Sequence, residues 1–182
     1  MTSNTTNKSK TSDIALYGLF IALIYVATRF INIPGPTPGG LFHLGNVMAF
    51  TIAIVFGKRA GAISAAFGMA LFDITSSFLP WAPFTFIIRF AMGYTIGYLS
   101  DKGTNGKASK SLFFNLLGIA LATIIMIGGY YIAEVILYGN LYAPIQSIWG
   151  NFMQCVVGTV LGLPLATAVK SAFIKRNLLT RA

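Results

Sequence analysis

The chain has 182 residues, of which 55% are hydrophobic and 9% are charged; its mean hydropathy is +0.74 and its formal net charge is +9. A soluble domain typically carries about 25% charged residues, so this composition excludes a soluble globular protein and indicates a single membrane domain. The apolar residues form continuous runs of about 20 residues, which favours transmembrane helices over an outer-membrane β-barrel.

Proline, glycine and basic residues divide the chain into six predicted helices. The first apolar run is too long for the core of a signal peptide and lacks a small-residue cleavage site, so we expect it to stay as the first span. The domain is predicted to cover residues 13–176, between a cytoplasmic tail over 1–12 and another over 177–182. The six helices are expected over residues 13–32, 43–57, 61–79, 84–100, 111–138 and 145–174.

The basic residues predict the orientation of this bundle. Every Lys and Arg except Arg29 and Arg89 falls in the N-terminal tail, the second loop, the fourth loop or the C-terminal region, all on one side of a six-span arrangement. Because basic loops stay in the cytoplasm, we expect an all-α bundle of six transmembrane helices with both termini cytoplasmic. The positive net charge is therefore a topology signal and does not indicate nucleic-acid binding.

Four charged residues remain inside the predicted spans, all toward the outer side: Arg29, Asp73, Arg89 and Glu134. A charge in hydrocarbon costs about 3 kcal/mol or more, so such residues normally face the bundle interior or a wet cavity. Two interpretations stay open. Asp73 with Arg89, and Arg29 with Glu134, form structural ion pairs between helix ends, or the same residues line a ligand pocket open to the outer face.

Glu134 and several neutral polar residues at the same depth are candidates for ligand contacts. Glu134 lies between Tyr130 and Tyr138, each four residues away and hence on the same helix face. Asn151 and Gln154 share one face of the last helix, where their amides offer donors and acceptors. An acid between aromatic rings, beside two amides, suits a ring that carries hydrogen-bonding groups.

The tryptophans and the single histidine each have a structural and a ligand-binding interpretation. Trp81 and Trp149 are typical anchors at the membrane interface, or they stack on a ligand ring. His43 caps its helix or contacts the ligand. The candidate ligand-binding residues are Glu134, Asn151, Gln154, Trp81, Tyr130, His43 and Arg89.

Motifs for catalysis or energy coupling are missing from the sequence. The segment GTNGKAS at 103–109 has the wrong glycine spacing for a phosphate-binding loop, and Ala108 stands where Ser or Thr is required. One histidine and one cysteine are too few for a metal cluster. We therefore expect no enzymatic activity, no metal and no cofactor, and interpret the chain as a binding unit whose energy comes from other subunits.

Pairs of small residues four positions apart allow helices to approach closely. We expect most of them to lie inside the bundle, and the first pair to be available to a partner. The pairs are Gly18/Ala22, Gly61/Ala65, Gly93/Gly97 and Gly158/Gly162.

Three segments, GGLFHLGNVMAF (39–50), FGKRAGAISAAFGMALFDITSSF (56–78) and WAPFTFIIRFAMGY (81–94), carry a family resemblance. They resemble the substrate-binding S components of energy-coupling factor (ECF) vitamin transporters, in the branch assigned to hydroxymethylpyrimidine and pyridoxine. The resemblance implies a bacterial plasma-membrane protein that binds a vitamin near its outer face, under a lid formed by NIPGPTPGG (32–40). It also implies a scaffold subunit and two ATPases as partners, with Gly18 and Ala22 in place of the AxxxA motif that meets the scaffold.

Other functions remain compatible with the sequence. An S component could bind riboflavin, pantothenate or cobalamin instead. A small autonomous proton-coupled carrier or channel could use Asp73, Glu134 and His43 as a relay, and a structural membrane protein would need the ion pairs alone.

Overall fold

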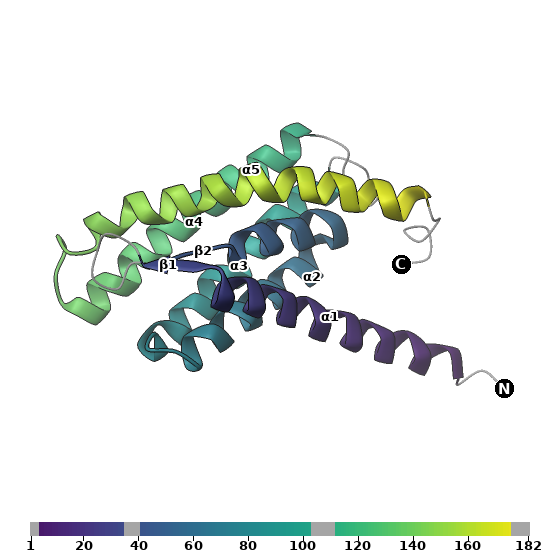
Figure 1. Ribbon diagram of the computed structural model, residues 1–182, viewed down its shortest axis with the longest axis horizontal. Coiled ribbons are helices and arrows are strands. Elements are labelled where there is room, and N and C mark those ends of the chain that lie inside the picture. Colours follow the sequence, from purple (N-terminus) through teal and green to yellow (C-terminus); the bar gives the residue numbers. More distant parts are fainter. Residues whose placement is uncertain (1–3, 35–40, 103–111, 176–182) are drawn as a thin grey trace.

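The computed structural model describes residues 4–34, 41–102 and 112–175. Figure 1 shows a helical protein in which the first residues of α1 and the last described residues of α5 lie toward the same end of the long axis. The described elements are α1 (Asn4–Phe30), β1 (Asn32–Pro34), β2 (Leu41–His43), α2 (Gly45–Ile74), the 3₁₀ turn η1 (Leu79–Trp81), α3 (Ala82–Lys102), α4 (Leu112–Tyr138) and α5 (Ile145–Lys175).

Helix α2 contains the predicted break between the second and third helices. Gly57 has φ 81° and ψ −175°, a left-handed value that glycine adopts without a Cβ penalty. A Cβ on Gly61 would collide with Ala53, so the segments on either side of Gly57 fold back against each other. The structure thus has two helical segments that meet at a sharp kink, at the break that the sequence predicts.

Four helices are long and apolar enough to cross a membrane, counted over the described residues: α1, α2, α4 and α5. Helix α3, which carries Arg89 near its middle, is not among them. This finding agrees with the prediction of an all-helical membrane protein. The count of six spans and the cytoplasmic position of both termini stay predictions.

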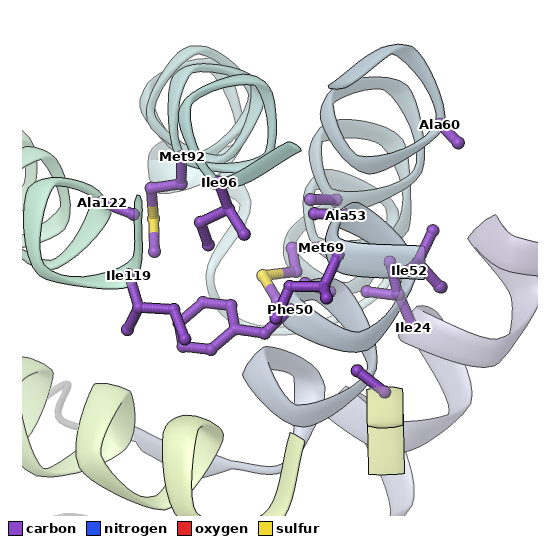
Figure 2. Packing of buried hydrophobic residues seen from close by; sticks show 14 of the residues in the cluster. Ile24, Phe50, Ile52, Ala53, Ala60, Met69, Met92, Ile96, Ile119 and Ala122 are labelled. Carbon is purple, nitrogen blue, oxygen red and sulfur yellow. The ribbon is translucent and has the colours of Figure 1, made fainter. Parts of the chain in front are cut away.

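The core forms where α2 packs against α1, α3 and α5, while α4 covers α3. Figure 2 shows its centre, where Phe50, Met69, Met92 and Ile96 meet side chains of neighbouring helices. The outward faces of α4 and α5 are apolar as well, as in Ile124, which is 67% exposed. An apolar exterior around an apolar core is expected of a helix bundle in lipid. Lipid tails are as apolar as the core side chains, so the hydrophobic effect does not drive apolar side chains into the interior.

Small residues set the close approach of α2 and α3. A Cβ on Gly93 would collide with the backbone of Gly61, and a Cβ on Gly97 with the backbone of Lys58. Another predicted pair, Gly158/Gly162, packs in the same way on the first half of α2. Gly18 has open space around it, so the first predicted pair is exposed on α1.

Two helix ends differ from the prediction. Helix α1 begins at Asn4 instead of residue 13, so the described part of the predicted tail is helical. Helix α2 ends at Ile74, five residues early, and hydroxyls add bonds to the carbonyls of its last turn: Thr75 Oγ1 donates to Leu71 O at 2.8 Å, and Ser76 Oγ to Asp73 O at 3.2 Å.

The predicted lid region begins and ends in a small antiparallel hairpin. Asn32 pairs with His43, Ile33 with Phe42 and Pro34 with Leu41. Residues 35–40 of the predicted lid, and the predicted C-terminal tail at 177–182, lie outside the described residues.

A buried polar cluster as the candidate functional site

Arg89 is the centre of a polar cluster inside the apolar bundle. Its side chain is 3% exposed and its three nitrogens point to three different helices. Nη1 donates to Asn46 Oδ1 of α2 at 2.5 Å, Nη2 to Gln154 Oε1 of α5 at 3.3 Å, and Nε to Tyr130 Oη of α4 at 3.2 Å. One guanidinium on α3 therefore ties the first half of α2 to the two C-terminal helices.

A second set of contacts surrounds these bonds. The Tyr130 hydroxyl donates to Thr85 Oγ1 at 3.1 Å, and the Arg89 guanidinium carbon lies 5.3 Å from the centre of the Tyr130 ring. Sulfur atoms fill the remaining space: Met126 Sδ is 3.5 Å from Arg89 Nη1 and 3.3 Å from Cys155 Sγ. Sulfur is a weak acceptor, so the oxygens of the amides and the phenol carry most of the solvation of the guanidinium.

All these acceptors are neutral, which distinguishes the cluster from a buried salt bridge. Removing an ion from water costs several kcal/mol in a protein interior, and neutral hydrogen bonds recover only part of that. The positive charge of Arg89 is thus hydrogen-bonded by neutral groups, and the buried Asp73 lies near enough to interact with it electrostatically. A site of this kind favours polar groups with lone pairs.

The structure does not form the predicted ion pairs within its described residues. Asp73 is 7% exposed, and its Oδ2 atom has no hydrogen-bond partner. The early end of α2 places Asp73 in the last turn of that helix, and Arg89 bonds to amides and a phenol instead. Arg29 is exposed, and Glu134 bonds to a serine.

Glu134 forms a smaller polar contact near the α4–α5 turn. Ser147 Oγ donates to Glu134 Oε2 at 2.8 Å and lies at the same distance from Pro144 O. Both residues are half-buried. Tyr138, one turn beyond Glu134 on α4, lies with its ring 6.0 Å from the Trp81 ring of η1.

His43 anchors the hairpin to α2. Its Nδ1 accepts a hydrogen bond from Gly45 N at 3.1 Å, and a Cβ on Gly45 would collide with Thr28 of α1 and Met69 of α2. Burial, and secondarily the charge of Arg89, lowers the pKa of His43 to about 3. The imidazole is therefore neutral and acts as a cap, which is the structural interpretation of this residue.

Of the predicted ligand-binding residues, the structure brings Arg89, Tyr130 and Gln154 into one cluster. Glu134 lies one turn from Tyr130, and Asn151 is half-buried one turn before Gln154. Trp81 and His43 lie outside the cluster: Trp81 packs on Phe78 and Tyr138, and His43 caps α2.

The sequence reasoning missed Asn46, Thr85 and Ser147. Asn46 is 1% exposed, which marks an amide held inside the bundle in the first turn of α2. The signal in the sequence was a polar residue within an apolar run, but Asn46 is uncharged and was therefore not selected. Thr85 and Ser147 are ordinary residues at helix starts and gave no signal.

A small cavity lies beside the cluster, lined by Asn46, Phe50, Arg89, Met92 and Ile96 among others. Its volume is about 10 Å³, roughly the space for one water molecule. A vitamin-sized ring does not fit there. No three His, Cys, Asp or Glu side chains come together among the residues described.

Comparisons with known proteins agree on one family. A family model described as the S component of ECF-type riboflavin transporters matches residues 8–171. The thiamine precursor transporter HmpT of Lactococcus lactis subsp. cremoris (strain MG1363) is 30% identical over 158 residues, which cover 86% of this chain and 87% of that protein. An uncharacterized protein in a gap 3′ region of Pyrococcus woesei is 30% identical over 148 residues, 81% of this chain and 94% of its own.

A solved structure extends the agreement to the fold. It is described as the S component of a bacterial ECF transporter and superposes with a TM-score of 0.67 over 91% of this chain and 99% of its own. Sequence identity in that pair is 21%, so the match concerns the arrangement of the helices.

Proposed function

The chain belongs to the family of ECF-type riboflavin transporter S components, and from this premise we propose that its own substrate is a small thiamine-precursor pyrimidine of the hydroxymethylpyrimidine type. The family predicted from the three sequence segments is confirmed. An S component is a substrate-binding subunit of a membrane transporter and not an enzyme, and this chain accordingly is a multi-pass plasma-membrane protein.

The relationship to HmpT supports a pyrimidine over riboflavin. That relative is described as a transporter of thiamine precursors, and the two chains match over most of their lengths. A pyridoxine-type pyridine is close in size and in its pattern of hydroxyl groups, and it is the second substrate we consider.

The neutral cluster around Arg89 is the observation that carries the proposal; its groups bond to one another in the structure, so a ring enters by displacing some of these bonds and widening the small cavity. Asn46, Gln154 and Tyr130 present amide and phenol groups that both donate and accept hydrogen bonds. A ring with nitrogen lone pairs, an amino group and a hydroxymethyl group needs such partners, and it needs no counter-charge. Glu134 adds a hydrogen-bond acceptor near the α4–α5 turn, and Asn151 and Trp81 complete the proposed site.

Membrane orientation and partners form the second part of the proposal. The two segments of α2 on either side of Gly57 act as separate spans, which gives six spans and places both termini in the cytoplasm, together with the basic loops. The substrate enters from the outer side beneath the β1–β2 hairpin. A scaffold subunit meets the exposed Gly18/Ala22 face of α1 and connects the chain to two ATPases.

Mass spectrometry of the purified protein tests the substrate. Cells are grown with thiamine precursors, pyridoxine and riboflavin, and the small molecules released on denaturation are identified. We expect a pyrimidine alcohol in stoichiometric amount. Riboflavin released instead would contradict the proposal.

Matched variants connect the bound molecule to the cluster. Gln154→Leu should reduce the retained substrate by about tenfold or more, since one lost hydrogen bond in a dry site costs about 1 to 3 kcal/mol. Gln146→Leu is the control, because Gln146 is exposed in the first turn of the same helix. Equal retention by both variants would remove Gln154 from the site.

A further inference from the structure

A row of aromatic side chains follows the outside of α3 toward its C-terminal end. Phe90, Tyr94 and Tyr98 are four residues apart and 42%, 41% and 38% exposed. Their rings are nearly parallel: 6.5 Å and 12° separate the first two, and 6.1 Å and 9° the second two. No bond within the cluster described above uses these rings.

Two ammonium groups lie at the end of this row. Lys58 Nζ is 5.8 Å from the centre of the Tyr94 ring and 5.3 Å from that of Tyr98, while Lys102 Nζ is 5.0 Å from the Tyr98 ring. Two positive charges therefore lie close to the same ring. This local excess of positive charge favours a bound anion.

The fold fixes Lys58 in this position. Its backbone packs directly on Gly97 of α3, where a side chain would collide with it. The kink at Gly57 precedes it immediately, and the Asp101 carboxylate lies over that kink. The lysine is thus presented to the aromatic row by a rigid turn between two helices.

Basic residues outnumber the acid in this region. Asp101 interacts electrostatically with Lys58 and with Lys170 of α5, so its single charge is shared. Arg59, next to Lys58, and Lys102 are both exposed. The surface at this end of α3 is therefore positive.

We propose that this surface, formed by Phe90, Tyr94, Tyr98, Lys58 and Lys102, is a binding site for one anionic phospholipid. The phosphate binds the ammonium groups at the end of the row, and an acyl chain lies along the rings. Phe90 and Lys102 are twelve residues apart, about 18 Å along a helix, which is similar to one half of the roughly 30 Å hydrocarbon layer. Basic residues beside a span attract anionic headgroups, and tyrosines favour the membrane interface.

Native mass spectrometry of the detergent-purified full chain tests the site. Phosphatidylglycerol is titrated against phosphatidylcholine of the same acyl chains. We expect one phosphatidylglycerol to be retained at concentrations where phosphatidylcholine is not. The double variant Lys58→Gln/Lys102→Gln should weaken that binding by about tenfold or more.

Two controls separate a built site from general attraction. Arg59→Gln/Lys8→Gln removes the same total charge but leaves both ring contacts, and it should retain the lipid within about twofold. Lys58→Arg/Lys102→Arg should also retain it, which shows that the chain folds with substitutions at these positions. Equal weakening by the Gln double variant and by the charge-matched control would overturn the proposal.

A photoreactive phenylalanine at Tyr94 identifies the occupant in membranes that contain all transporter subunits. Crosslinking to phospholipid is expected. Crosslinking mainly to the scaffold subunit would assign this face to a protein interface and overturn the proposal.

Discussion

Removing the hydrogen bond between Arg89 and Asn46 is the sharpest test of what stabilises the polar cluster. Nη1 and Oδ1 are 2.5 Å apart, and both side chains are buried. Asn46→Leu keeps the size of the side chain but leaves this N–H of a buried cation facing only methionine sulfurs. We expect it to lower the free energy of unfolding by about 3 kcal/mol, in the range measured when one partner of a buried charged contact is removed.

The reverse change should cost less. Arg89→Met leaves Asn46 Oδ1 without its donor, a loss of about 1 to 3 kcal/mol, but it also removes a buried charge whose desolvation is unfavourable. We expect a net loss of about 1 to 2 kcal/mol. In the double variant both groups are apolar, so adding Asn46→Leu to Arg89→Met should cost almost nothing.

Reversible unfolding in mixed detergent measures all four proteins of this cycle. The account predicts a coupling energy of about 2 to 3 kcal/mol between the two positions. Asn151→Leu is the control for an amide replaced by leucine without a guanidinium contact, and it should cost about 1 kcal/mol or less. Costs that add to within about 0.5 kcal/mol would refute the reasoning.

Two further predictions concern packing and pH. In a thermal unfolding assay, Gly93→Ala should destabilise the protein by about 3 kcal/mol or more, or prevent folding, since its Cβ would collide with the Gly61 backbone. Gly128 has open space around it, so Gly128→Ala should be neutral or slightly stabilising in the same assay. The lowered pKa of His43 means that the unfolded chain takes up a proton below about pH 6.5 and the folded chain does not. Stability should therefore fall between pH 6.5 and pH 5, by at most about 1.4 kcal/mol per pH unit. His43→Gln should flatten that slope, and an unchanged slope would contradict the neutral cap.

Much of the site was accessible from the sequence because ionisable groups are rare in an apolar chain. Arg89, Tyr130 and Gln154 were selected by type and depth, and the structure joins them through one guanidinium. Asn46 escaped because an uncharged amide in an apolar helix changes local hydropathy very little. Its role depends on the fold of α2, which brings it opposite Arg89.

The Asp73–Arg89 pair shows why a matched depth is not enough to predict a contact. The predicted third helix continues to residue 79, toward the corner at Trp81. Helix α2 ends at Ile74 instead, where the Thr75 and Ser76 hydroxyls bond to carbonyls of its last turn, and four residues separate it from η1. The two groups interact electrostatically but form no ion pair, because a small change at a helix end redirects the side chain. Local hydrogen bonds of this kind are weak signals in a sequence.

The ends of the other elements were limited in the same way. Residues 4–12 are polar and show no apolar period, yet they continue α1. The hairpin strands have three residues each and include a proline, so they resemble a loop in sequence. The kink at Gly57 was predictable, since glycine followed by two basic residues marks a boundary, but the close packing of its two segments was not.

Calorimetric titration of the purified chain with a hydroxymethylpyrimidine tests the central claim, that the chain binds this pyrimidine at the polar cluster. The account predicts saturable binding to one site, weakened by about tenfold or more in Gln154→Leu and unchanged in Gln146→Leu, with riboflavin binding more weakly than the pyrimidine. Tighter binding of riboflavin, or equal affinity in the two glutamine variants, would contradict it.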